Sequence, residues 1–129
     1  MRKQSWQVVL NLLTLAVAGH SIVSGMLLMF FPVSTLRLVG WNYTGQAFWP
    51  SQAGLFLALL GGVYASAIRL RPLTWFLIIS KATAVVFLLL SAVCLDAPRV
   101  VVAMALGDGL MGLGVAFAFL MERRVYASA

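Results

Sequence analysis

The sequence predicts an all-α integral membrane protein, a four-helix bundle whose helices run up and down, antiparallel to one another. The first observation is composition: 63% of the 129 residues are hydrophobic, 9% are charged, and the mean hydropathy is +1.03. Soluble domains have about 25% charged residues, so the few charges of this chain cannot cover a soluble surface. The second observation is that the apolar residues form four runs, each close to the ~20 residues that a membrane helix needs.

The four runs cover about residues 7–31, 48–68, 73–95 and 100–121, within a single membrane domain of residues 1–129. Prolines stand near the helix ends, because proline resists helix continuation but is tolerated in a first turn; they are Pro32, Pro50, Pro72 and Pro98. A signal peptide competes for the first run, since Met1-Arg2-Lys3 precede it and Ala16-Val17-Ala18 fits a cleavage site. The run continues through Phe31, too long for a signal peptide, so a retained helix is expected.

Loop charges orient the helices. With a cytoplasmic N-terminus, the inner flanks carry six basic residues and the outer flanks carry two. The inner residues are Arg2, Lys3, Arg69, Arg71, Arg123 and Arg124, and the outer ones are Arg37 and Arg99. Because cytoplasmic loops are rich in Lys and Arg, both termini are expected in the cytoplasm, beneath a bacterial inner membrane. The longer connection at 33–47 mixes apolar and polar residues and is expected to lie along the outer interface.

Small residues mark the faces through which the helices are expected to pack. Lipid offers no hydrophobic driving force between helices, so their contacts favour small residues that allow close approach. The expected packing positions are Gly54, Ala58, Gly61, Gly62 and Gly112.

Lys81 and Asp108 are ionisable residues well inside two neighbouring apolar runs. A charge at a helix centre costs about 2.5–3.5 kcal/mol on insertion scales, so such residues normally face protein and find a partner. With a rise of about 1.5 Å per residue, their depths differ by about 8 Å, which a lysine stem spans. We therefore predict an ion pair between the third and fourth helices. It either fixes the register of these helices or serves a proton path, an ion path or a headgroup contact.

His20 and Gln52 are further polar residues inside the runs, and we treat them as candidate ligand or proton sites. A membrane haem normally needs a second axial ligand, and His20 is the only histidine. A hydrogen-bonded structural histidine is therefore the favoured interpretation, and no cofactor is predicted. A pigment, haem or quinone beside His20 is the alternative.

Several function classes are excluded by what the chain lacks. Cys94 is the only cysteine, so an internal disulfide, a CxxC redox pair and a cysteine metal cage cannot form. The sequence has no Ser-His-Asp set, metal-ligand cluster or phosphate loop, so we predict no catalytic residue, no metal site and no enzyme activity. The net charge of +6 sits at the helix ends, where it orients the protein and contacts headgroups, so nucleic-acid binding is rejected.

Short motifs spread over most of the chain carry a family resemblance. They are Phe31-Pro32, Phe48-Trp49-Pro50, Gly54, Gly61-Gly62, Lys81 and Asp108-Gly109. In these motifs the chain resembles the DoxX-like and related small four-helix bacterial membrane proteins, many of them of unknown function. Some of these relatives are membrane partners of quinone-linked oxidoreductases, so the resemblance implies an accessory or anchor role.

The first functional hypothesis is therefore an accessory or structural subunit of a larger membrane complex, such as a redox or energy-converting one, or a homo-oligomer. One alternative is a proton-coupled or small-solute transporter element that uses Asp108 and Lys81. Another is a bundle that binds lipid, quinone or pigment in a groove beside His20. The lipid bilayer is a partner in each case.

Overall fold

The computed structural model describes residues 2–127, which form five α-helices and no strand. They are α1 (Arg2–Phe30), α2 (Pro32–Leu38), α3 (Phe48–Ser66), α4 (Pro72–Cys94) and α5 (Val100–Ala127). The all-α prediction is confirmed. Helices α1 and α5 extend further toward the chain ends than the apolar runs predict. Glutamine, glutamate and arginine are good helix formers, so the backbone stays helical where the side chains become polar.

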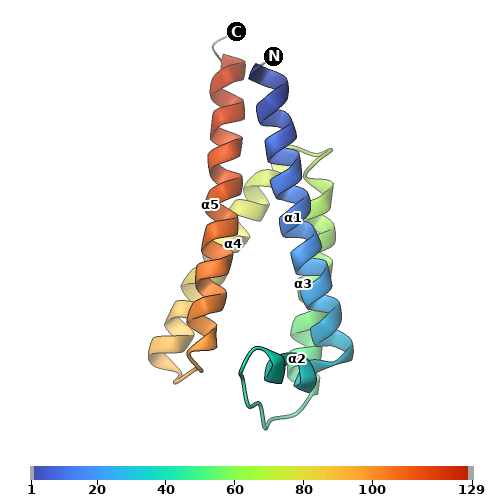
Figure 1. The fold of residues 1–129 in the computed structure, drawn as a ribbon, viewed down its shortest axis with the longest axis vertical. Coiled ribbons are helices and arrows are strands. Elements are labelled where there is room, and N and C mark those ends of the chain that lie inside the picture. Colours follow the sequence, from blue (N-terminus) through green and yellow to red (C-terminus); the bar gives the residue numbers. More distant parts are fainter. Residues whose placement is uncertain (1, 128–129) are drawn as a thin grey trace.

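The four long helices pack as two antiparallel hairpins, α1 with α3 and α4 with α5 (Figure 1). The hairpins contact each other near the start of α1 and the end of α5, and they diverge toward the opposite end (Figure 1). Trp6 packs edge-on against Phe117 in the contact region, with ring centroids 5.9 Å apart. Buried residues from all four long helices form the hydrophobic core. They are Leu10, Val17, Ala18, Tyr64, Leu77, Val115, Ala118 and Phe119.

This arrangement refines the predicted bundle. The helices alternate in direction along the chain as expected, but they form two pairs that splay apart rather than one closed bundle. The physical reason lies in α3, whose glycines draw it against α1, while its contact with α4 is slight in the described part of the chain.

Glycines let the backbones of α1 and α3 touch. A Cβ added at Gly54 would lie 2.5 Å from the backbone nitrogen of Met29 and 2.6 Å from the carbonyl oxygen of Gly25. A Cβ added at Gly61 would lie 2.9 Å from the carbonyl oxygen of Ala18. Real side chains do not fit at such distances, so glycine is required for this approach.

The other two small residues predicted to pack on α3 differ from each other. Ala58 lies at the contact with α1, because a Cβ at Gly25 would fall 2.5 Å from the Ala58 backbone nitrogen. Gly62 is exposed, and a Cβ there would meet no atom within 4 Å. The packing contact predicted for Gly62 is therefore not formed within the described chain, because Gly62 is turned by about 100° from Gly61 around the helix.

Within residues 2–127, three helical segments are long and apolar enough to cross a membrane, and they support an integral membrane protein. They are Gln4–Phe30, Pro72–Cys94 and Val100–Ala127. Helix α3 is the fourth predicted span but is not among these segments. Its first turns contain Pro50, Ser51 and Gln52, which lower the hydropathy of a helix of only 19 residues.

The connection at 33–47, which was predicted without a helix of its own, is partly helical. Its first half belongs to α2, where the Thr35 hydroxyl donates a hydrogen bond to the carbonyl oxygen of Leu27 at 3.0 Å. Leu36 is buried, whereas Leu38 is 88% exposed. The exposed leucine agrees with contact to a lipid interface, and the location of this segment at the outer interface stays a prediction.

Candidate functional site

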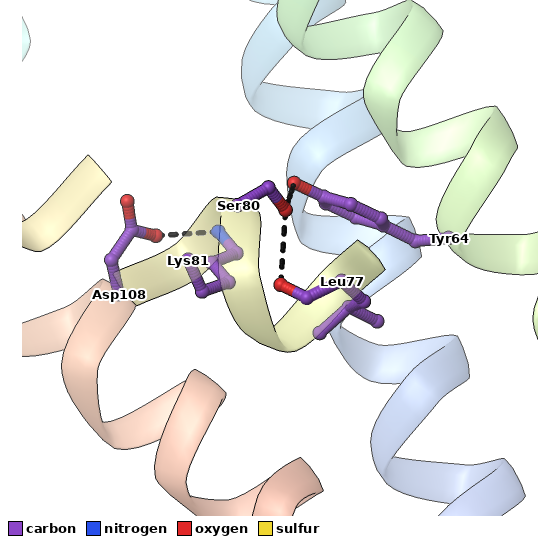
Figure 2. Close-up of polar contacts among 5 residues, drawn as sticks. All are labelled: Tyr64, Leu77, Ser80, Lys81 and Asp108. Carbon is purple, nitrogen blue, oxygen red and sulfur yellow. Dashed lines mark hydrogen bonds and ion pairs between the residues drawn. The ribbon is translucent and has the colours of Figure 1, made fainter. Parts of the chain in front are cut away.

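The Lys81 and Asp108 side chains meet between α4 and α5 (Figure 2). Lys81 Nζ donates a hydrogen bond to Asp108 Oδ1 at 2.5 Å. The Lys81 side chain is 4% exposed and the Asp108 side chain is 20% exposed. The structure thus brings together the two charged residues expected to pair, and the carboxylate is the more accessible partner.

Gly112 makes room for the lysine. It is buried on α5, one turn beyond Asp108, and a Cβ there would lie 3.1 Å from Lys81 Cβ. Such a contact is tighter than almost all real Cβ contacts, so a larger residue would push the lysine stem aside. The small residue predicted for packing at this position therefore lies against the ion pair itself.

A second polar contact lies beside the pair and joins the two hairpins. The Tyr64 hydroxyl of α3 and the Ser80 hydroxyl of α4 are 2.7 Å apart (Figure 2). Ser80 donates its only hydroxyl proton to the carbonyl oxygen of Leu77 at 2.9 Å, so Tyr64 is the donor in the contact with Ser80. Lys81 Nζ lies 6.0 Å from the centroid of the Tyr64 ring. The tyrosine thus brings α3 to the edge of the ion pair.

Sequence reasoning did not single out Tyr64 and Ser80. The available signal was that Tyr64 is a tyrosine within an apolar run, because a buried tyrosine hydroxyl usually finds a hydrogen-bond partner. Its partner was not predictable from spacing, because the divergence of the hairpins decides which residues of α3 reach α4.

We expect the Tyr64–Ser80 hydrogen bond to contribute modestly to stability. Tyr64→Phe and Ser80→Ala should each lower the free energy of unfolding in detergent micelles, and the two changes should couple by about 0.6 kcal/mol, the typical value for such bonds in membranes. Circular dichroism during denaturation of the two single variants and the double variant measures this coupling. Strict additivity would mean that the hydrogen bond does not join the hairpins.

His20 and Gln52 remain apart from this polar contact region. His20 is exposed on α1 and Gln52 is half-buried on α3. Neither forms a hydrogen bond or ion pair with Lys81 or Asp108. The structure therefore does not bring His20 and Gln52 to the ion pair. The His20 side chain has no hydrogen bond within residues 2–127, so the hydrogen-bonded structural histidine predicted from the sequence is not formed within the described chain.

Neither a metal-ligand cluster nor a known relative indicates a function for this site. Within the described residues, no group of three or more His, Cys, Asp or Glu side chains could hold a metal ion. The site places one carboxylate and one amine in contact, with space for the lysine stem left by Gly112 and with the Tyr64 ring nearby. No protein family, curated protein or solved structure matches the chain. The resemblance to the DoxX-like proteins therefore stays a prediction.

Proposed function

We propose that the protein is an interaction subunit of the membrane, which packs against a larger membrane complex or against further copies of itself. The observation that carries this proposal is the position of His20. This residue lies at mid-depth of α1 and is exposed, and its side chain has no hydrogen bond or ion pair within residues 2–127. Ionisable residues in membrane spans usually face protein or a water-filled cavity, so a second chain covering His20 would supply the missing environment.

The helix geometry supports an external partner. Ala18 contacts α3, and His20 is turned from it by about 200° around α1. The histidine therefore points away from the hairpin partner of its own helix. The divergence of the two hairpins adds to the surface that a partner helix can cover (Figure 1).

The proposal includes four membrane crossings. Helix α3 lies against α1 through Gly25, Gly54 and Gly61, so it occupies the same depth as a helix that is long and apolar enough to span. Four crossings leave both termini on one side, and the bias of basic residues favours the cytoplasm of a bacterial cell.

Particle mass after gentle extraction tests the proposal. We expect native-membrane particles that contain this chain to have a mass well above 14.0 kDa of protein, with partner chains in fixed ratio. His20→Leu should release the partner, because leucine cannot hydrogen-bond. His20→Gln should largely retain it, because the amide still can.

Two outcomes would contradict the proposal. One is a single copy of the chain without partner protein in the native particles. The other is a His20→Leu particle of unchanged mass and composition.

A second candidate function is a proton or ion transfer element at Lys81 and Asp108. It is favoured by the position of the Asp108 carboxylate, which lies within a spanning candidate and is 20% exposed, so the protein does not enclose it completely. Intramembrane carboxylates commonly mark such paths. A proton or solute flux in liposomes that Asp108→Asn abolishes would support this candidate, and flux no higher than in empty liposomes would exclude it.

A further inference from the structure

A separate cavity lies between the start of α1, the start of α4 and the end of α5. It has a volume of about 860 Å³ and is lined from α1, α4 and α5 and by the residue preceding α4. Its lining includes Gln7, Arg71, Trp75, Phe119, Arg123 and Tyr126. Neither the ion pair at Lys81 nor His20 belongs to it, so its role is independent of the proposed function.

Charge in this cavity is partly balanced. Arg71 Nη2 lies 3.1 Å from Glu122 Oε1, and the Glu122 side chain is only 8% exposed. The same Arg71 nitrogen is buried and donates no hydrogen bond. Glu122 neutralises one of two arginines, so the lining keeps one unbalanced positive charge, on the exposed Arg123.

Aromatic rings form the apolar wall of the cavity. The Arg123 guanidinium lies 5.3 Å from the centroid of the Phe119 ring, within range of a cation–π contact. Trp75 packs edge-on against Phe119 with ring centroids 5.4 Å apart. The cavity thus combines a cationic side with an aromatic side, which suits a ligand that is anionic at one end and apolar at the other.

The cavity lies at the start of α4, which is the level of the lipid headgroups when this helix crosses a membrane. Arg71 directly precedes α4, which begins at Pro72 and is an apolar spanning candidate. Trp75 and Tyr126 are of the residue types enriched where membrane meets water. A phospholipid places its phosphate at this level and its acyl chains deeper.

We propose that this cavity binds the headgroup phosphate of an anionic phospholipid. Arg123 contacts the phosphate together with the remaining donors of Arg71, because the guanidinium fork matches phosphate geometry. Glu122 holds the Arg71 side chain in place through their ion pair. An acyl chain lies along Trp75 and Phe119.

Lipid-dependent stability of the purified full chain tests this site. The midpoint of thermal unfolding in an uncharged detergent is followed while dioleoylphosphatidylglycerol, dioleoylphosphatidylcholine or inorganic phosphate is added. Phosphatidylglycerol should raise the midpoint, and the other two should have little effect. Salt is kept high so that the general attraction of exposed charges is screened.

Arg123→Gln and Arg124→Gln form a matched pair, because both remove one exposed positive charge but only Arg123 lines the cavity. Arg123→Gln should need about tenfold more phosphatidylglycerol for the same shift, as expected for the loss of a charge-assisted hydrogen bond. Arg124→Gln should behave like the native protein. Arg123→Lys keeps the charge but loses the fork, and it should fall between the two.

Three results would overturn the assignment. Equal stabilisation by phosphatidylcholine would show that net lipid charge is not recognised. Equal stabilisation by inorganic phosphate would show that no lipid is needed. Equal losses in the Arg123 and Arg124 variants would show general charge attraction instead of a site.

Discussion

Gly54→Ala should destabilise the protein by about 1–3 kcal/mol, the usual cost of forcing extra atoms into a packed core. The new methyl group would lie 2.5 Å from the Met29 nitrogen and 2.6 Å from the Gly25 carbonyl oxygen. Both atoms belong to the backbone of α1, so no side-chain rotation can relieve the overlap, and α1 and α3 must separate. Unfolding of the purified protein in mixed detergent micelles, followed by circular dichroism, measures the loss.

Gly62→Ala is the matched control, on the same helix. Its Cβ would meet no atom within 4 Å, so only the backbone preference changes. Alanine favours a helix over glycine by about 1 kcal/mol, and this variant should be as stable as the native protein or more so. If Gly54→Ala were as stable as Gly62→Ala, the backbone contact between α1 and α3 would not hold the first hairpin together.

The number and type of the long helices could be predicted from the sequence because lipid imposes a simple rule. A segment that crosses the bilayer must satisfy its own backbone hydrogen bonds, so an apolar run of the right length becomes a helix. The predicted runs accordingly correspond to α1, α3, α4 and α5, with ends that differ by a few residues. Helix α2 was missed because its seven residues are too few to show a periodic pattern.

The pairing of the helices was harder to predict, because one small-residue face can dock on more than one neighbour. Gly54 and Gly61 indicated that α3 packs closely, but not that its partner is α1 rather than α4. Residue type alone did not predict which glycines pack, because the adjacent Gly61 and Gly62 have different surroundings: Gly61 lies against α1 and Gly62 is exposed. The splay of the hairpins has no counterpart in the local sequence pattern.

The polar site was partly predictable for an energetic reason. Two opposite charges deep in neighbouring apolar runs have few ways to avoid a large cost, and pairing is the simplest. Lys81 and Asp108 are indeed in contact. Tyr64 and Ser80 carry no charge, so burying them costs less free energy than burying an unpaired charge. Their contact was therefore harder to predict from the sequence.

Asp108→Asn is expected to lower the free energy of unfolding by about 3 kcal/mol, because it leaves the Lys81 ammonium unpaired in a buried position. The Lys81 side chain is only 4% exposed, so water cannot replace the lost carboxylate. Lys81→Met should also destabilise the protein, because it leaves the Asp108 carboxylate without its partner. Unfolding in mixed micelles compares these variants with the native protein.

The double variant Lys81→Met with Asp108→Asn separates pairing from the effect of each residue alone. Removing both charges should restore stability to within about 1 kcal/mol of the native protein, because replacing a whole buried ion pair is often close to neutral. If Asp108→Asn were as stable as the double variant, the two residues would not depend on each other. Flux through the same proteins in liposomes distinguishes the two roles of the pair. If the pair only fixes helix register, any flux lost in Asp108→Asn should return in the stable double variant. A proton or ion path would stay inactive in the stable double variant, since the Asp108 carboxylate is still absent.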